Sequence, residues 1–201
     1  MEQVHDTKQR LIDSAQELFY ARSYADVGVQ EICQKAGVKK GSFYHFFPSK
    51  RDLTLAMLDE SWNRTREAML VDAFTRDIPP LQRIERFLER TYQHHKAVQN
   101  QTGQMLGCPY GNLASEMSTQ DEAIRVRVNQ IFRDLEAPIE EALKEAVAVG
   151  ELSGLDTRAT AEAMVAYLEG ITLVAKTRND PEIVRKLGPA VLSLAIPVKP
   201  G

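Results

Sequence analysis

Cysteine is scarce in this sequence, and long apolar runs are missing. The 201 residues include only two cysteines, Cys33 and Cys108, too few for the disulfide framework of a small secreted protein. No apolar run approaches the roughly 18 residues that a membrane span needs. The first residues, Met-Glu-Gln-Val-His-Asp, have neither the positive charge nor the apolar core of a signal peptide. We therefore expect a cytoplasmic protein with no membrane association.

Segments that alternate apolar and polar residues, as β-strands do, are also missing. Apolar residues instead recur at helical spacing, which predicts an all-α fold of about nine helices. Pro138 lies inside one long predicted helix and should kink or split it. Capping residues, glycines and prolines predict these helices in order: one that begins at Asp6 or Thr7, two short ones over 29–36 and 40–47, a fourth from Ser49 towards Val71, a fifth from Pro79, a sixth near 103–117, a seventh capped by Thr119 and Glu122, an eighth from Asp156 to Lys176, and a ninth opened by Asp180 and Pro181.

Acidic residues are absent from one stretch of a chain whose net charge is −3. None lies between Glu31 and Asp52, and residues 1–53 carry +1 while the remainder carries −4. An anionic partner is therefore attracted to the first region and repelled by the rest, although a solvated lysine face has the same charge pattern. The cations between Glu31 and Asp52 are Lys35, Lys39, Lys40, Lys50 and Arg51.

The two short predicted helices are joined by a turn that contains Gly37. This arrangement is a helix-turn-helix, whose second helix enters the major groove of DNA. At about 100° per residue, one side of the second helix carries three aromatic rings that must turn towards the core. These rings belong to Phe43, Phe46 and Phe47. The other side carries Lys40, Gly41, Tyr44 and His45, with Ser42 between the two sides.

The outward residues have chemistry that suits DNA. A glycine lets a phosphate approach the backbone closely, a lysine supplies positive charge, and tyrosine and histidine donate hydrogen bonds to phosphates or base edges. Lys50 adds a cation near the start of the next helix, beside free backbone amides. An ordinary solvent-exposed surface is the alternative. The pattern favours a protein that binds double-stranded DNA.

This part of the sequence resembles the DNA-binding domain of the TetR family of bacterial regulators. The resemblance covers about the first 55 residues closely and the rest only in helical layout. It implies a three-helix helix-turn-helix domain over residues 1–53 and a helical ligand-binding and dimerisation domain over residues 54–201. The matching segments are Ala36-Gly37-Val38, Lys40-Gly41-Ser42-Phe43-Tyr44 and Phe47-Pro48-Ser49-Lys50.

The resemblance also implies which residues contact DNA. Tyr44 and Lys50 would bind phosphates. At three places the chain departs from the family: Gly28 stands where a hydroxyl residue usually caps the second helix, Lys39 stands where Ser or Thr is common, and Ser23 replaces a common glycine before Tyr24. We expect Lys39 to add a phosphate contact. Contacts to bases or to the DNA backbone are implied for Gln30, Lys40, Gly41, Ser42 and His45.

A single small helix-turn-helix reads few base pairs. A dimer reads more base pairs, because it places two recognition helices about 34–36 Å apart on a pseudo-palindromic operator. The resemblance implies a homodimer formed through the last two helices, whereas the alternative is that the same residues form the core of one chain. The residues suited to the interface are Ala159, Ala163, Met164, Ala166, Leu168, Gly170, Ile171, Ile183, Val184, Leu187 and Val191.

The resemblance further implies a ligand cavity among the middle helices and a repressor that a small-molecule effector releases from DNA. Composition does not name the effector, and each candidate residue is also compatible with plain core packing. The candidate walls are Trp62, Phe87, Tyr92, Met105, Cys108, Tyr110, Phe132 and Tyr167, with His95 and Asn112 as polar anchors.

Cys108 supports an alternative hypothesis. The pattern Gly-Cys-x-x-x-Asn-Leu around it resembles a TetR subgroup in which a cysteine senses electrophiles or oxidants. A helix N-terminus lowers the pKa of a thiol and favours the reactive thiolate. A buried cysteine that acts as a small apolar side chain is the competing interpretation.

Enzymes and modules that bind only protein partners are disfavoured. His94 and His95 are adjacent, so on a helix they cannot chelate one metal as a pair four residues apart would. No nucleophile with a base beside it is recognisable. We expect no catalytic residue, no metal and no cofactor.

Overall fold

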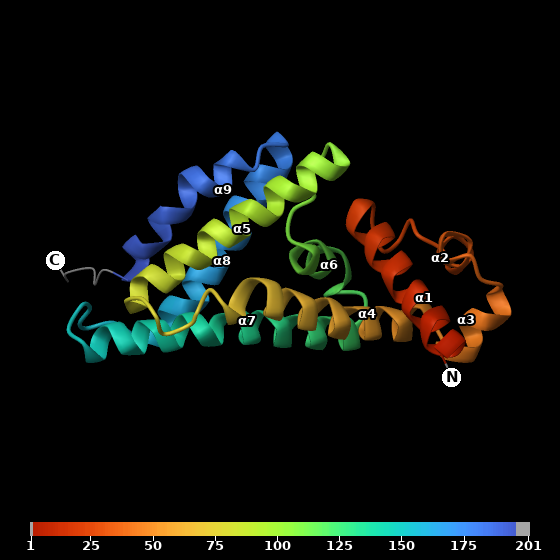
Figure 1. Ribbon diagram of the computed structural model, residues 1–201, viewed down its shortest axis with the longest axis horizontal. Coiled ribbons are helices and arrows are strands. Elements are labelled where there is room, and N and C mark those ends of the chain that lie inside the picture. Colours follow the sequence, from red (N-terminus) through yellow and green to blue (C-terminus); the bar gives the residue numbers. More distant parts are fainter. Residues whose placement is uncertain (1, 196–201) are drawn as a thin grey trace. The chain divides into compact units, whose positions relative to one another are not determined.

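The computed structural model describes residues 2–195, with side chains from residue 6 onward. Within this range the all-α prediction is confirmed: there are nine α-helices and no strand (Figure 1). No helix in the described range is long and apolar enough to cross a membrane. The α-helices are α1 (Glu2–Ala21), α2 (Val29–Ala36), α3 (Lys40–Phe46), α4 (Lys50–Thr65), α5 (Pro80–Thr102), α6 (Pro109–Met117), α7 (Glu122–Ala148), α8 (Thr157–Arg178) and α9 (Glu182–Leu187). A π-helical segment, η1 (Arg66–Val71), follows α4, and a 3-10 helix, η2 (Gly188–Ala195), follows α9.

The predicted beginnings of α1 and α6 were wrong. α1 begins at Glu2, and Asp6 lies inside it, where its carboxylate pairs with Arg10 at 3.1 Å instead of capping the helix. α6 begins only at Pro109, because Gly103 ends α5 in the left-handed conformation at φ 76° and the chain between them is not helical.

α7 also differs from its prediction. Asp121, rather than Thr119, accepts a hydrogen bond from the N–H of Ile124 at 3.1 Å and so caps the helix. Pro138 does not split α7, which continues through it to Ala148. A proline removes one backbone donor, and the fully buried Ile139 that follows it keeps the helix packed.

Several predicted caps are confirmed. Ser49 Oγ accepts a hydrogen bond from the N–H of Asp52 at 3.2 Å, immediately before α4. Asp156 accepts hydrogen bonds from the N–H groups of Arg158 and Ala159 at the start of α8. After α9 the chain continues as the 3-10 helix η2, which contains Pro189. These boundaries are therefore set by local sequence.

The chain divides into two compact units. Unit 1 comprises the residues up to Arg64 together with Pro109–Asn129, and unit 2 comprises Thr65–Cys108 together with the residues from Gln130 onward. In unit 1, α1, α2 and α3 pack against one another. Their shared core is built from side chains with no exposed surface: Leu11, Ile12, Ile32 and Phe43.

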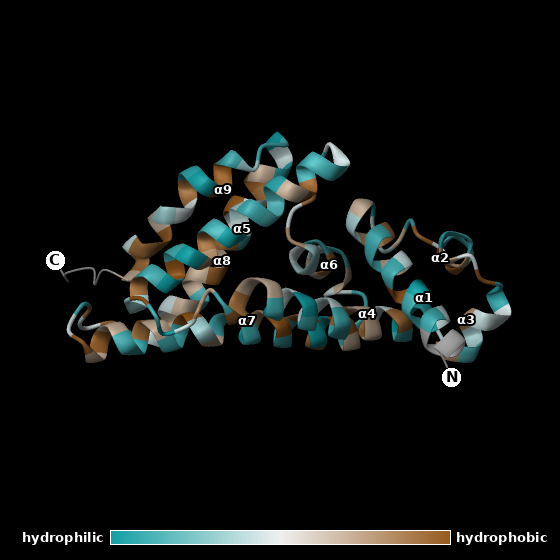
Figure 2. Cartoon of the chain, viewed as in Figure 1, coloured by the Kyte–Doolittle hydropathy of each residue, from teal (hydrophilic) through white to brown (hydrophobic). Residues whose placement is uncertain are grey.

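Unit 2 is built around α5, α8, α9 and η2. Figure 2 shows apolar and polar bands alternating along α5 and α8, as expected of helices with one buried side. The buried members include Ile84 of α5, Met164 of α8, Val184 of α9 and Val191 of η2, each at most 1% exposed. This packing occurs within a single chain.

Candidate nucleic-acid interface

The turn between α2 and α3 fixes the direction of α3. Gly37 ends α2 in the left-handed conformation at φ 66°, and the N–H of Val38 donates to the carbonyl of Cys33 at 2.9 Å. Arg10 of α1 donates from Nη1 to the carbonyl of Ala36 at 3.0 Å. The end of α2 is therefore held both by its own backbone and by α1.

Two of the three phenylalanines of the α3 segment turn inward as predicted. Phe43 is fully buried and Phe47 is 4% exposed, with their ring centroids 6.0 Å apart. Phe46 is only half-buried, and its ring meets that of His45 edge-on at 4.9 Å. The prediction for Phe46 was wrong because α3 ends at this residue, which leaves the ring at the flank of the helix instead of beneath it.

The opposite side of α3 faces outward within unit 1. Tyr44 is 51% exposed, and Lys40 Nζ lies 6.0 Å from the centroid of its ring. A Cβ atom added at Gly41 meets nothing within 4 Å, so packing within the chain does not require a glycine there. Of the predicted DNA contacts, Ser42 is half-buried, and the exposed ones on α2, α3 and the turn between them are Gln30, Lys39, Lys40, Gly41, Tyr44 and His45.

Lys50 has a different environment from the other predicted DNA contacts. It is half-buried, its Nζ donates a hydrogen bond to the carbonyl of Tyr24, and it lies 3.9 Å from the centroid of the Tyr24 ring and 5.5 Å from that of Phe19. Burial lowers the pKa of Lys50, and the nearby Glu116 carboxylate opposes that shift. Lys50 therefore anchors the loop between α1 and α2 in addition to supplying charge.

Sequence reasoning missed Glu116. This residue of α6 accepts hydrogen bonds from the N–H groups of Tyr24 at 2.8 Å and Ala25 at 2.6 Å. In the turn after α6, Asp121 lies 3.9 Å from Arg51 of α4. The partners of Glu116 lie 91 and 92 residues earlier in the chain, so no local pattern identifies this contact.

The residues predicted for a dimer interface separate into two groups. One group is buried within the single chain and supports its core: Met164, Leu168, Ile171, Ile183, Val184 and Val191. The other group is exposed: Ala159, Ala163, Ala166, Gly170 and Leu187. Leu173, which the sequence prediction omitted, is 60% exposed on the same helix as the first four.

Three of the predicted cavity residues lie in unit 1. The rings of Trp62 and Tyr110 are both buried and meet edge-on, with centroids 6.1 Å apart. The Tyr110 hydroxyl lies 3.1 Å from Ser61 Oγ. Asn112 is half-buried. Trp62 and Tyr110 are thus part of an aromatic contact in unit 1.

The other predicted cavity residues lie in unit 2. The hydroxyl of Tyr92 donates to Glu182 at 2.6 Å, and that of Tyr167 donates to the carbonyl of Leu187 at 2.9 Å. His95 is 4% exposed, and burial lowers its pKa to about 4; among the described side chains, its Nδ1 is one of few buried polar atoms with no hydrogen-bond partner. Tyr167 is half-buried; of the remaining residues, Phe87 and Met105 are buried, and Cys108 and Phe132 are half-buried.

The thiol of Cys108 is paired with the side chain of Glu169, which is half-buried. Burial raises the pKa of the Glu169 carboxyl, and the hydrogen bond from Cys108 opposes this shift. A carboxylate that accepts a hydrogen bond from a thiol stabilises the protonated thiol rather than the thiolate. This contact does not favour the thiol-sensing alternative.

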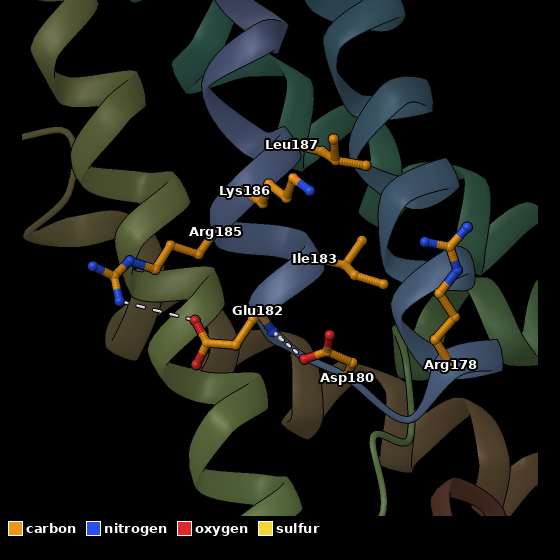
Figure 3. A pocket seen from close by; sticks show the side chains of 7 residues that line it. All are labelled: Arg178, Asp180, Glu182, Ile183, Arg185, Lys186 and Leu187. Carbon is orange, nitrogen blue, oxygen red and sulfur yellow. Dashed lines mark hydrogen bonds and ion pairs between the residues drawn. The ribbon is translucent and has the colours of Figure 1, made fainter.

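One surface pocket of unit 2 lies on α9 and the end of α8 (Figure 3). It has a volume of about 490 Å³. Asp180 accepts a hydrogen bond from the N–H of Glu182 at 3.0 Å, and Arg185 lies 3.9 Å from the Glu182 carboxylate. The lining is mostly charged and contains none of the predicted cavity walls: it comprises Arg178, Asp180, Glu182, Ile183, Arg185, Lys186 and Leu187.

Comparison with known proteins agrees with this geometry. The family model for bacterial regulatory proteins of the tetR family matches residues 11–57, and that for the tetracyclin repressor-like C-terminal domain matches residues 80–191. The first match contains the whole helix-turn-helix, and the second contains α5 to α9.

Individual relatives match most of the chain. Transcriptional regulator AcuR of Cereibacter sphaeroides is 32% identical over 178 residues, which are 87% of this chain and 78% of the relative. The HTH-type transcriptional repressor DhaR of a Mycobacterium species is 26% identical over 194 residues, 94% and 92% of the two chains. The crystal structure of regulatory protein TetR from Rhodobacter sphaeroides has a TM-score of 0.81 and 30% identity, and it covers 94% of this chain and 98% of that one. The exposed face of α3, the two family matches and these relatives together show that the chain belongs to the TetR family and is a DNA-binding transcriptional regulator.

Proposed function

We propose that this protein binds a pseudo-palindromic double-stranded operator as a homodimer and is released from it by a small-molecule effector. The observation that carries the proposal is the outward face of α3, where Tyr44 and Lys40 are exposed above the buried Phe43 and Gly41 leaves open space. Such a face presents charge, donors and a close backbone approach to a duplex. We assign the DNA contacts to Gln30, Lys39, Lys40, Gly41, Ser42, Tyr44, His45 and Lys50.

The response that we propose is repression in the cytoplasm. DhaR, which matches nearly the full length of the chain, is named a transcriptional repressor. We assign DNA binding to residues 1–53 and the response to residues 54–201. An effector weakens operator binding if it binds better to the conformer with low DNA affinity, with a typical coupling of about 1–3 kcal/mol.

DNA binding is tested by selecting duplexes from a random pool with the purified protein. We expect enrichment of a pseudo-palindrome whose affinity falls steeply with salt, because phosphate contacts release counterions. Tyr44→Phe should bind the selected duplex several-fold more weakly at an unchanged melting temperature, since Tyr44 is exposed and we assign its hydroxyl a hydrogen bond to DNA. Failure to enrich any duplex would refute the proposal.

The exposed stripe of α8 supports the homodimer. Ala159, Ala163, Ala166, Gly170 and Leu173 are spaced by four, three, four and three residues, which places them along one side of the helix. Small side chains allow the helices of two chains to approach closely. A leucine that is 60% exposed at the end of such a stripe indicates a surface that a partner covers.

The homodimer is tested by sedimentation of Leu173→Glu. We expect this variant to be monomeric and to lose most of its operator affinity, because a charge buried in the interface has no partner. Val126→Glu is the matched control, since Val126 is 52% exposed on α7 and lies outside the stripe. A dimeric Leu173→Glu protein would contradict the assigned interface.

For the effector we propose the buried side chains of unit 2, with His95 as a polar anchor. Its Nδ1 has no hydrogen-bond partner among the described residues and is available to a polar group of a ligand. Compounds that raise the melting temperature of the wild-type protein are identified first, and the same compounds are then tested on His95→Phe. An unchanged stabilisation of His95→Phe would remove His95 from the proposed site.

A further inference from the structure

Glu116 holds two consecutive backbone donors with one carboxylate. Its Oε2 accepts from the N–H of Tyr24 and its Oε1 from the N–H of Ala25, at 2.8 and 2.6 Å. Both donors belong to the loop between α1 and α2. Hydrogen bonds to an ionised acceptor are stronger than neutral ones, and two from one rigid carboxylate also fix direction. The loop is therefore tied to α6 at a defined position.

Lys50 binds the backbone carbonyl of Tyr24, the residue whose N–H binds Glu116. Its ammonium donates to the carbonyl of Tyr24, whereas Glu116 accepts from the Tyr24 N–H. Glu116 of α6 therefore binds the peptide groups on both sides of Tyr24, and Lys50 of α4 binds the one between Tyr24 and Ala25 through its carbonyl. In addition, an ion pair between Asp121 and Arg51 joins the turn after α6 to α4.

The start of α2 has no side-chain cap, and its local contacts come from Arg22, which pairs with Glu31 in the first turn and donates to the carbonyl of Asp26 in the loop. The N-cap of α2 is Gly28, and no described side chain caps it. Gln30, a proposed DNA contact, lies in the first turn of α2, and Lys50 is another proposed contact. The loop that Glu116 holds leads directly into the first turn of α2 and contacts Lys50, so it contributes to the positions of both.

α6 belongs to unit 1 by its contacts, although its sequence lies in the C-terminal half of the chain. The C-terminal family model includes α6, because it covers residues 80–191. By its contacts, however, α6 clusters with α1 to α4 in unit 1. Glu116 supplies two hydrogen bonds between α6 and the rest of this unit.

We propose that Glu116 is a positioning residue for DNA binding, which links α6 of the C-terminal region to the loop that orients α2 and Lys50. The proposal rests on the DNA-binding function. Removing the Glu116 carboxylate releases the loop and lowers operator affinity. Because coupling is reciprocal, operator binding in turn restrains α6 through the same two hydrogen bonds.

Whether DNA affinity rises or falls when the Glu116 charge is removed distinguishes a positioning role from a purely electrostatic one. Removing a negative charge near the DNA-binding residues should strengthen binding if charge alone matters. The positioning role predicts the opposite: Glu116→Gln, which places an NH₂ group against a backbone N–H, should weaken binding about tenfold. Glu122→Gln removes the same charge from a side chain that is 84% exposed at the start of α7, and it should bind equally or slightly more tightly.

The experiment measures the affinity of the full-length wild type, Glu116→Gln, Glu116→Ala and Glu122→Gln for the duplex that the wild type selects. Amide hydrogen exchange is measured on the same proteins. We expect faster exchange confined to the loop at Tyr24 and Ala25, weaker DNA binding by both Glu116 variants, and similar melting temperatures for wild type and Glu116→Gln. If Glu116→Ala does not fold, Glu116→Gln decides the outcome.

Three outcomes would overturn the proposal: wild-type affinity in Glu116→Gln, unchanged exchange at Tyr24 and Ala25, or faster exchange throughout unit 1 with a lowered melting temperature. The last outcome assigns Glu116 a general stabilising role. A wild-type protein that selects no duplex contradicts the DNA-binding function itself, and the exchange measurement still reports on whether Glu116 holds the loop.

Discussion

The ammonium group of Lys50 donates a hydrogen bond to the backbone carbonyl of Tyr24 and lies against the face of its ring. A lysine has three N–H donors, so this bond leaves two for a phosphate. The interaction holds the Lys50 ammonium group in place in the DNA-free protein, at the edge of the proposed DNA surface. Less side-chain entropy is then lost on binding.

Replacing Lys50 by alanine should therefore change the salt dependence of DNA binding. Loss of one phosphate contact lowers the slope of log K against log salt by about 0.9 and weakens binding to all sequences alike. Fluorescence anisotropy titrations at several salt concentrations give the slope. Lys35→Ala is the control, because Lys35 is paired with Glu17 of α1 at 2.6 Å and is not among the proposed DNA contacts. An unchanged slope for Lys50→Ala would leave Lys50 with only its anchoring role.

Gly41→Ala should separate folding from DNA binding. The added methyl group meets nothing within 4 Å in the chain, and alanine is favoured over glycine in a helix by up to about 1 kcal/mol. We expect an unchanged or higher melting temperature together with operator affinity that is lower by about tenfold, because the methyl group keeps a phosphate away from the backbone. Undiminished affinity would show that DNA does not approach α3 at Gly41.

Gly37→Ala should destabilise the helix-turn-helix. A residue with a Cβ atom pays about 1–2 kcal/mol in the left-handed conformation that Gly37 adopts at φ 66°. Urea unfolding at fixed protein concentration measures this loss. As a matched change, Gly28→Ser adds a capping side chain at a glycine with negative φ and should stabilise by a few tenths of a kcal/mol. Equal stability of the two variants would contradict the assigned turn.

His95 should make stability depend on pH. Its pKa is lowered from 6.5 to about 4 by burial and by His94, so the unfolded chain takes up a proton at a higher pH than the folded one does. The stability that neutral His95 contributes is complete above pH 6.5 and is lost as the pH falls towards 4, by about 3 kcal/mol in total. His95→Asn should lose correspondingly less between pH 7 and pH 4. The exposed His45→Asn should follow the wild type, and parallel curves for all three proteins would show that His95 does not titrate in this way.

The sequence by itself determined much of the local structure, although not where α1 and α6 begin. The left-handed glycine at the end of α2, the caps at Ser49 and Asp156, and the inward and outward faces of α3 all follow from backbone conformation and helical spacing over a few residues. The family match covers the same region, since its signature lies in these short segments. Even here Phe46 was misplaced, because the end of α3, and not the spacing, decides how far its ring is covered.

Tertiary packing alone decided the rest. Glu116 and Tyr24 are 92 residues apart, and nothing in either local sequence indicates that a carboxylate will meet a loop N–H. Periodicity likewise could not tell Met164, which is fully buried in one chain, from the exposed Ala163 beside it as a candidate for the interface. The Glu116 contact and the burial of Met164 both depend on which helices pack against one another. Local spacing fixes the faces of a helix, but only the folded chain determines what each face meets.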